Sequence, residues 1–317
     1  MMTICYGGTA DDADMWDAAM RTALSQSAAL ADQVRYWTTP EDGPAEDVDF
    51  LLFTPNGTIA DLAPYTSLKA IQSLWAGVES YLARTDLPSD VPLLRMVEPG
   101  LSQGMVDYVV THTLRHHMDL DYSLERSRGA RWDEVHPPLT SERGVGILGL
   151  GALGQACGSA LRAIGFQVSG WSRSPKNVAG IRSFVGSDGL ELFLRTAETL
   201  IVLVPETPET TGLLDAQRLA CLPEGAHIIN VARGPVLSET ALLAALEQNV
   251  GTATLDVFDT EPLPEDHAFW RHERITITPH IASVTRPETA SKEVVRQIER
   301  YAAGQKFQHV VDKSRGY

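Results

Sequence analysis

The chain has 317 residues, of which 44% are hydrophobic and 21% are charged, as is ordinary for a soluble globular protein. This length allows two domains with buried cores. The formal net charge of −15 argues against a nucleic acid or a membrane as partner, because both bind basic surfaces, although a few local arginines can still attract an anionic substrate.

The first part of the chain predicts a small α/β domain, because short apolar runs alternate there with helical stretches. Short strands are expected at residues 3–6, 34–37, 48–53, 68–73 and 91–95. A helix from Asp14 to Leu30 separates the first two strands. Residues 102–124 then have the pattern of one long helix that leads out of this domain.

The second part of the chain predicts a parallel sheet that is covered on both faces, because its expected strands are short and continuously apolar. These strands are expected at residues 145–148, 166–171, 199–204, 227–231, 251–257 and 275–278. Ser238 is a natural N-cap for the helical stretch that follows it. A last helix near residues 286–303 is expected to return to the first domain.

A glycine-rich turn is the most informative motif of the chain. Gly149, Gly151 and Gly154 form a G-x-G-x-x-G pattern between the strand at 145–148 and an apolar helical stretch, Ala152 to Ile164. Such glycines allow a tight turn, approach of the backbone to a pyrophosphate, and close packing of helix on strand. The first N–H groups of the helix, at Ala152, Leu153 and Gly154, would point at the phosphates. The motif predicts a dinucleotide site rather than a purely structural turn.

These patterns together predict a two-domain α/β protein. We expect a dinucleotide-binding Rossmann domain with a doubly wound parallel sheet at residues 101–283 and a smaller α/β substrate domain at residues 1–100 and 284–317. The cleft between the two domains is the expected ligand site.

The residues after the second strand of the nucleotide domain favour NADPH as cofactor. A site for NAD usually carries an acidic residue there, bonded to the ribose 2′-hydroxyl. This chain has instead Ser172, Arg173, Ser174 and Lys176, with no carboxylate. Because a 2′-phosphate requires donors and positive charge, we predict NADPH. The alternative is a solvated basic loop that tolerates NADH as well.

Three polar residues follow strands in the second half of the nucleotide domain: Arg233, Glu261 and His280. The carboxyl ends of the strands in a doubly wound sheet face the cofactor crevice. A cation, an acid and an imidazole at that edge suit the reduction of a 2-keto acid. Each residue also has a structural interpretation: a surface arginine at a helix start, an exposed acid in a turn, and a histidine within the core.

The order and spacing of several segments resemble the D-isomer-specific 2-hydroxyacid dehydrogenase family, and within it the glyoxylate/hydroxypyruvate reductase A branch. The matching segments are residues 74–79, 149–154, 204–212, 230–234, 256–262 and 279–282. Before residue 74 only the general layout is similar. The resemblance implies a flavodoxin-like substrate domain, a homodimer, and NADPH-dependent reduction of a small 2-keto acid, glyoxylate or hydroxypyruvate, to the D-hydroxy acid.

The resemblance also implies a role for each candidate residue. Arg233 would bind the substrate carboxylate and polarise the keto oxygen. His280 would be the general acid, and Glu261 would fix its tautomer and raise its pKa. The loop of Trp75, Ala76 and Gly77 would bind the substrate carboxylate through backbone N–H groups. The cofactor would be bordered by Val204, Pro205, Thr207, Thr211, Val231 and Ala232 and contacted at its nicotinamide carboxamide by Asp256.

Trp75 departs from the family pattern, which commonly has a small residue there, and it would narrow the pocket or point away from it. Phe53 is read as core packing more readily than as part of the substrate wall. His112 and His116 have the spacing of a two-histidine metal pair, but no third ligand is near in sequence, so we predict no metal.

Two other functions stay open from the sequence: an NAD(H)-dependent dehydrogenase of a larger 2-hydroxy acid, and a non-catalytic protein that senses the cofactor. The N-terminus lacks the features of a signal peptide, and no apolar run approaches the roughly 18 residues that span a bilayer. Cys5, Cys157 and Cys221 are far apart in apolar settings. We therefore expect buried thiols in a reducing compartment and a cytoplasmic protein.

Overall fold

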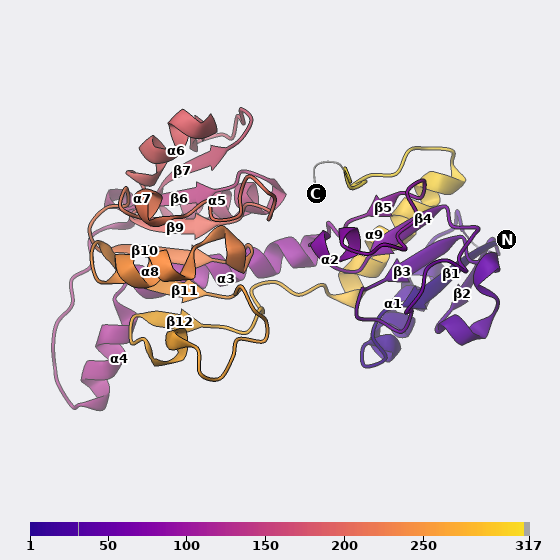
Figure 1. Ribbon diagram of the computed structural model, residues 1–317, viewed down its shortest axis with the longest axis horizontal. Coiled ribbons are helices and arrows are strands. Elements are labelled where there is room, and N and C mark those ends of the chain that lie inside the picture. Colours follow the sequence, from indigo (N-terminus) through magenta and orange to yellow (C-terminus); the bar gives the residue numbers. More distant parts are fainter. Residues whose placement is uncertain (31, 314–317) are drawn as a thin grey trace. The chain divides into compact units, whose positions relative to one another are not determined.

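The computed structural model describes residues 1–30 and 32–313, and the chain forms two compact units. One unit consists of Met1–Leu101 with Val284–Tyr317, and the other of Ser102–Ser283. Residues 314–317, the end of the predicted substrate domain, lie outside the described residues. Each unit is built around its own parallel sheet, which confirms the predicted two-sheet α/β class (Figure 1).

The first unit has a five-stranded parallel sheet in the order β2-β1-β3-β4-β5, the strand order of flavodoxin-like folds. Its strands are β1 Met2–Gly7, β2 Val34–Trp37, β3 Phe50–Phe53, β4 Ala70–Ser73 and β5 Leu93–Leu94, so all five predicted strands are confirmed. Its helices are α1 Ala13–Ser25, α2 Glu79–Leu82 and α9 Pro287–Ala302, with short 3-10 turns at Pro40–Asp42 and Ala45–Asp47. The helix expected to reach Leu30 therefore ends at Ser25.

Both faces of this sheet are covered. Met20 of α1 and Val294 of α9 are buried with Phe50 on one face. Phe53 is buried on the other face with Tyr81, and the centroids of their rings lie 5.7 Å apart. Phe53 is thus a core residue, as its apolar strand suggested.

The second unit has a seven-stranded parallel sheet in the order β12-β11-β10-β9-β6-β7-β8. Read from β8, six strands follow the Rossmann order and β12 adds a seventh. The strands are β6 Gly144–Leu148, β7 Gln167–Ser172, β8 Arg182–Val185, β9 Thr199–Val202, β10 Ala226–Asn230, β11 Val250–Leu255 and β12 Ile275–Ile277. The helices are α3 Pro99–His117, α4 Leu120–Arg128, α5 Ala152–Ile164, α6 Gly186–Leu194, α7 Ala216–Leu219 and α8 Glu239–Leu246. Short 3-10 turns lie at Thr140–Glu142, Gly234–Val236 and Ala268–Arg271.

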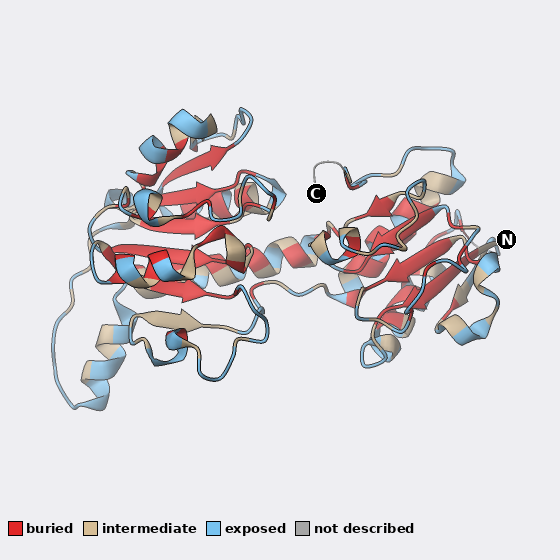
Figure 2. Ribbon diagram, viewed as in Figure 1, coloured by how far each residue is buried: buried red, intermediate tan, exposed pale blue. Residues whose placement is uncertain are grey.

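The central strands of this sheet are buried, while the edge strands β8 and β12 are partly exposed (Figure 2). Met105 of α3 and Cys157 of α5 are buried on one face of the sheet. Phe193 of α6 and Leu242 of α8 belong to the core on the other face. This double cover explains why the central strands are continuously apolar.

The prediction of one long helix over residues 102–124 is wrong. The chain forms two helices, α3 and α4, with Asp119 between them in the left-handed conformation (φ 50°). An aspartate tolerates this conformation better than most residues. The first helix also begins earlier than expected, at Pro99, because proline fits the first turn of a helix, where its missing N–H is not needed.

Other local expectations can be compared directly. Ser238 caps α8 as predicted, since its hydroxyl accepts a hydrogen bond from the N–H of Ala241 at 3.3 Å. All three cysteines are free. Burial raises the pKa of Cys5 and of Cys157 to about 12, whereas Cys221 is only partly buried, against expectation. Within residues 1–30 and 32–313, no helix combines the length and apolar character needed to cross a membrane.

Candidate active site

His280 and Glu261 form a close pair at the carboxyl edge of the larger sheet. Glu261 lies in the loop after β11 and His280 follows β12, so parallel strands bring both loops to one edge. Nδ1 of His280 lies 2.6 Å from Oε2 of Glu261. The side chain of His280 is 49% exposed and that of Glu261 35%. Nε2 of the imidazole makes no hydrogen bond to any described residue, so this nitrogen remains available to a ligand.

The pair is ordered and charged. The other carboxylate oxygen of Glu261 accepts a hydrogen bond from the N–H of Phe258 at 2.9 Å. Burial opposes ionisation of Glu261, but the hydrogen bonds from His280 and Phe258 outweigh it and lower the pKa of the carboxyl. The hydrogen bond to Glu261 raises the pKa of His280 despite burial. The geometry therefore favours an imidazolium beside a carboxylate.

Arg233 follows β10, the strand next to β11, and is held by its neighbours. Asn230 binds this turn at both ends: its amide donates to the carbonyl of Arg233 at 3.2 Å, and its side-chain oxygen accepts from the N–H of Ala232 at 3.2 Å. A β-carbon on Gly234 would lie 2.0 Å from the backbone of Phe258. Glycine therefore lets the Arg233 segment touch the turn that leads to Glu261.

The charge of Arg233 acts on both members of the pair. After burial and hydrogen bonding, it lowers the pKa of Glu261 further, and it offsets part of the rise in the pKa of His280. The structure thus brings the three predicted residues together at one edge of a single unit. A cation next to an imidazole with a free nitrogen can bind a carboxylate and protonate a neighbouring oxygen.

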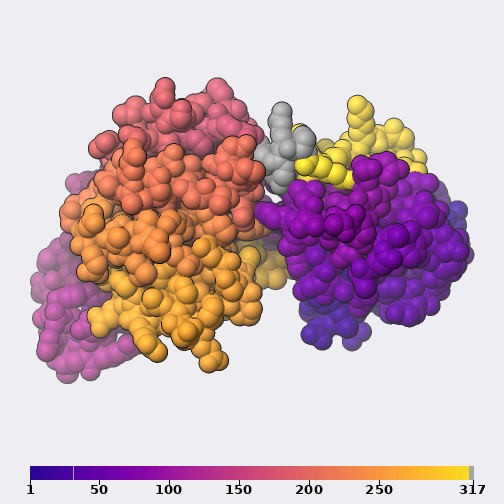
Figure 3. Space-filling view, viewed as in Figure 1, coloured from indigo at the N-terminus to yellow at the C-terminus, as the bar shows by residue number. Residues whose placement is uncertain are grey.

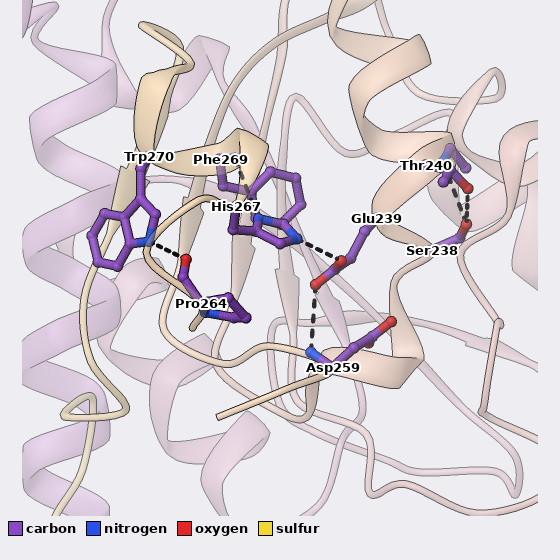
Figure 4. Close-up of polar contacts among 9 residues, drawn as sticks. Ser238, Glu239, Thr240, Asp259, Pro264, His267, Phe269 and Trp270 are labelled. Carbon is purple, nitrogen blue, oxygen red and sulfur yellow. Dashed lines mark hydrogen bonds and ion pairs between the residues drawn. The ribbon is translucent and has the colours of Figure 1, made fainter. Parts of the chain in front are cut away.

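A second polar network involves Asp259, in the turn that leads to Glu261 (Figure 4). The carboxylate of Glu239, at the start of α8, lies 3.1 Å from Nε2 of His267 and accepts from the N–H of Asp259 at 3.4 Å. Nδ1 of His267 accepts from the N–H of Phe269, so the ring donates to Glu239 through Nε2. Burial, and then the charge of Glu239, raise the pKa of Asp259. Sequence reasoning missed this pair, because nothing local links residues 28 positions apart.

Asp256 is almost fully buried, and its carboxylate binds the loop that carries His280. It accepts hydrogen bonds from the hydroxyl of Thr278 at 2.6 Å, from the N–H of Ile281 at 2.8 Å and from the N–H of Ala282 at 2.9 Å. Through these hydrogen bonds Asp256 holds the loop that carries His280. Its predicted contact with a nicotinamide stays a prediction.

The glycine turn has the geometry that a dinucleotide site needs. Gly149 has φ +115°, and a β-carbon there would lie 2.8 Å from the backbone of Leu203. A β-carbon on Gly154 would lie 1.9 Å from the carbonyl oxygen of Gly149. In contrast, a β-carbon on Gly151 would meet nothing within 4 Å. The turn is therefore packed tightly on one side and open at Gly151, at the N-terminus of α5, where a pyrophosphate would fit.

The predicted 2′-phosphate residues lie at the end of β7, where Ser172 is the last residue of the strand, and in the turn that follows it. The hydroxyl of Ser172 donates to the carbonyl of Ser174 at 2.7 Å and shapes the turn. Arg173, Ser174 and Lys176 are exposed. The pKa of Glu209 is lowered by a hydrogen bond with Thr207 and, to a smaller degree, by the charge of Arg173, so this arginine lies within electrostatic reach of the 205–211 loop.

The remaining predicted cofactor residues lie just beyond adjacent strands. Val204 follows β9, and Val231 and Ala232 follow β10, and all three are buried. Pro205 and Thr211 are exposed. The hydroxyl of Thr211 donates to the carbonyl of Thr207 at 3.0 Å, so these threonines shape their loop.

The loop of Trp75, Ala76 and Gly77 belongs to the smaller unit. The hydroxyl of Ser73 donates to the carbonyl of Trp75 at 2.7 Å and accepts from its N–H at 3.0 Å. The indole of Trp75 lies edge-on to Tyr81, with ring centroids 6.0 Å apart. The N–H groups of Ala76 and Gly77 donate to no other described residue. This loop therefore offers two backbone donors, while the N–H of Trp75 is already used.

The histidines of α3 pack against the sheet. His116 stacks on His227 with ring centroids 4.4 Å apart. Burial lowers the pKa of His112 and of His116 and favours their neutral forms. In the part of the chain that the structure describes, no group of three or more His, Cys, Asp or Glu side chains could hold a metal ion.

Comparison with known proteins gives consistent similarities. Residues 109–282 match the family model for the NAD binding domain of D-isomer specific 2-hydroxyacid dehydrogenases. Glyoxylate/hydroxypyruvate reductase A of Serratia proteamaculans is 41% identical over 312 residues, which cover 96% of this chain and 97% of that protein.

Two solved structures are similar over the full length of the chain. One is a D-isomer specific 2-hydroxyacid dehydrogenase from Xanthobacter autotrophicus Py2 in complex with NADPH and MES, with 40% identity, a TM-score of 0.90, and 100% and 99% of the two chains covered. The other is an NADPH-dependent glyoxylate/hydroxypyruvate reductase from Sinorhizobium meliloti in complex with NADP and sulfate, with 30% identity, a TM-score of 0.87, and 100% of each chain covered.

Proposed function

The chain belongs to the D-isomer specific 2-hydroxyacid dehydrogenase family, and on that premise we propose that it reduces glyoxylate to glycolate and hydroxypyruvate to D-glycerate with NADPH. The observation that carries the proposal is the contact of 2.6 Å between His280 and Glu261, next to Arg233 and in the same unit as the glycine turn. The similarity to glyoxylate/hydroxypyruvate reductases supports the choice of small substrates.

In this proposal each residue of the site has one task. Arg233 binds the substrate carboxylate and draws electron density toward the keto oxygen. His280 donates the proton on Nε2 to that oxygen, while Glu261, bound to Nδ1, stabilises the imidazolium and fixes the ring. NADPH, when bound, supplies the hydride that reaches the carbonyl carbon. The products are the hydroxy acid and NADP⁺, and His280 regains its proton from solvent.

We assign the cofactor to the open side of the glycine turn. The N–H groups of Ala152 and Leu153 at the start of α5 would bind the pyrophosphate beside Gly151. Arg173 and Lys176, with Ser172 and Ser174, would bind the 2′-phosphate, which NADH lacks. Relatives that were solved with NADPH or NADP support this preference. In the smaller unit, the free N–H groups of Ala76 and Gly77 are the proposed second contact for the substrate carboxylate.

The direct test follows the loss of reduced-nicotinamide absorbance with glyoxylate, hydroxypyruvate, pyruvate and a bulky 2-keto acid, each with NADPH and with NADH. Rapid turnover of the two small substrates with NADPH is expected. Turnover that requires NADH would contradict the assignment of residues 172–176, and a preference for the bulky acid would contradict the choice of small substrates. Cofactor binding without turnover of any keto acid would indicate a cofactor sensor.

We further propose that the active protein is a homodimer that pairs through the α4 region. Apolar side chains are exposed there: Leu120 at 44%, Leu124 at 45% and Trp132 at 93%. The helix lies at the surface of its unit, in magenta in Figure 3, and none of its residues is buried. Large apolar side chains exposed within one short segment favour an interface there.

Light scattering coupled to size exclusion tests the proposed dimer. The wild-type chain should be dimeric, and the double variant Leu120→Glu with Leu124→Glu should be monomeric. Leu192→Glu, a matched change at an exposed leucine of α6, should leave the dimer intact. A monomeric wild type would contradict the proposal. The predicted cytoplasmic location can be checked by fractionation of the cells that make the protein.

A further inference from the structure

The backbone of His280 has an unusual conformation that its surroundings must maintain. Its φ is 54°, in the left-handed region that a residue with a β-carbon rarely adopts. In this conformation Nδ1 of the ring lies 2.6 Å from Oε2 of Glu261. A residue in such a conformation returns to an ordinary one unless neighbouring contacts hold it. The contacts around His280 therefore decide where its proton is presented.

Asp256 supplies these contacts on both sides of His280. Its carboxylate accepts from Thr278, two positions before the histidine, and from Ile281 and Ala282 after it. Its backbone carbonyl also accepts from the N–H of His280 at 2.9 Å. The loop is thus bound by one buried residue at four points. Thr278 provides the only one of these four donors that is a side chain, and it can be removed without altering the backbone.

Thr278 is bound in turn by Tyr108 of α3. The hydroxyl oxygens of Tyr108 and Thr278 lie 2.6 Å apart. Because the single proton of Thr278 goes to the carboxylate of Asp256, Tyr108 must donate to Thr278. Burial raises the pKa of Tyr108 to about 12, so this donor keeps its proton at neutral pH. A directed chain of hydrogen bonds therefore runs from Tyr108 through Thr278 to Asp256.

We propose that Thr278 and Tyr108 are positioning residues for the reduction: with Asp256 they hold the backbone of His280 so that its imidazole stays on Glu261 and presents Nε2 to the keto oxygen. The proposal rests on the proposed function, because it treats His280 as the proton donor. Neither residue touches the reacting atoms. Their loss should let the loop relax and move the ring off Glu261, while Arg233, which binds the substrate, is unchanged.

The chain provides matched substitutions to test this role in the full-length protein. Thr278→Val removes the hydroxyl but keeps the shape, and Thr278→Ser keeps the hydroxyl. Tyr108→Phe removes only the outer link. Thr276→Val makes the same change two residues earlier, where the hydroxyl makes no hydrogen bond to the rest of the described chain. Two readouts separate positioning from stability: the split between kcat and KM for glyoxylate, and the titration of the His280 ring by NMR, assigned with His280→Gln.

Thr278→Val should lower kcat roughly 10- to 100-fold, the effect of losing a hydrogen bond to a charged group. KM for glyoxylate should change less than about twofold, since Arg233, the group proposed to bind its carboxylate, stays in place. The pH titration of His280 should move to lower pH, because the ring leaves Glu261 while Arg233 still faces it. Thr278→Ser and Thr276→Val should behave as wild type. Tyr108→Phe should have a smaller effect and add nothing to Thr278→Val.

A Thr278→Val protein with wild-type kcat and an unshifted His280 titration would overturn the proposal. Equal loss in Thr278→Ser would also overturn it, since the hydroxyl would not be the cause. If Thr278→Val does not fold, as judged by circular dichroism, the same comparison between Tyr108→Phe and wild type decides the matter. If the wild-type chain reduces neither keto acid, the proposed function fails, whereas the His280 titration still shows whether Thr278 holds the imidazole.

Discussion

Two glycines of one turn offer a test that separates cofactor binding from folding. A methyl group at Gly154 would lie 1.9 Å from the carbonyl oxygen of Gly149, whereas a methyl group at Gly151 would meet no atom of the protein within 4 Å. Gly151 also has an ordinary φ of −74°, which alanine adopts easily. Alanine should therefore disturb the protein at position 154 and only the bound cofactor at position 151.

Alanine should mainly change the stability of the protein at position 154 and mainly change NADPH affinity at position 151. Gly154→Ala should lower the free energy of unfolding by at least about 2 kcal/mol, because the clash with fixed backbone exceeds the gain of roughly 1 kcal/mol from alanine in a helix. Gly151→Ala should cost about 0.5 kcal/mol, the usual difference between glycine and alanine at an N-cap. It should nevertheless weaken NADPH binding roughly 100-fold or more, about 2.7 kcal/mol, because the methyl group occupies the space of the pyrophosphate.

Thermal unfolding with and without NADPH measures both effects. At a fixed concentration, bound cofactor raises Tm by an amount that grows with the logarithm of its affinity. The wild type and Gly154→Ala should therefore both gain stability from NADPH, although Gly154→Ala starts from a lower Tm, by roughly 4–8 °C. Gly151→Ala should start near the wild-type Tm and gain almost nothing. Wild-type NADPH affinity in Gly151→Ala would refute the placement of the pyrophosphate at this turn.

Four further outcomes are expected. With wild type, kcat/KM for glyoxylate should fall as the pH rises through the raised pKa of His280, because the protonated ring is the donor, and fall again in acid below the lowered pKa of Glu261. Glu261→Gln should reduce kcat roughly 100-fold and move the alkaline limb to lower pH, and an unmoved limb in the pH–rate profile would contradict the pairing. Replacing Arg173 and Lys176 by alanine should raise KM for NADPH roughly 10- to 100-fold and leave KM for NADH within about twofold, so equal losses with both cofactors would exclude a 2′-phosphate contact. Glu239→Gln should lower the free energy of unfolding by about 1 kcal/mol in urea titrations. Unchanged stability would mean that the hydrogen bonds of Glu239 with His267 and Asp259 do not stabilise the fold.

The sequence was sufficient wherever structure depends on local chemistry. All eleven expected strands are present, since short apolar runs between turn residues are what a covered parallel sheet requires. The glycine turn could also be predicted, because a tight turn or close packing requires glycine at positions 149 and 154. The strand β8 was missed, since Arg182–Val185 is a partly exposed edge with no apolar run. The break between α3 and α4 was missed because it depends on a single left-handed residue, Asp119.

The catalytic candidates also show which features the sequence predicts and which only the structure shows. The types of Arg233, Glu261 and His280 and their places after strands were enough to predict that they share an edge. Their order in space was not readable: the contact of 2.6 Å between His280 and Glu261 joins residues 19 positions apart. The Arg233 segment packs against the turn that leads to Glu261 through a close approach at Gly234. No sequence pattern predicts this approach.

The sequence by itself therefore determined the class of each unit, the cofactor turn and the kinds of group available for chemistry, because these follow from local periodicity and residue type. Only the tertiary structure decided how those groups are held. The contact between Tyr108 and Thr278 joins residues 170 positions apart, and that between Glu239 and His267 joins residues on separate elements. Such hydrogen bonds form only after the sheet has brought its loops together, since a side chain is oriented by neighbours in space and not by neighbours along the chain.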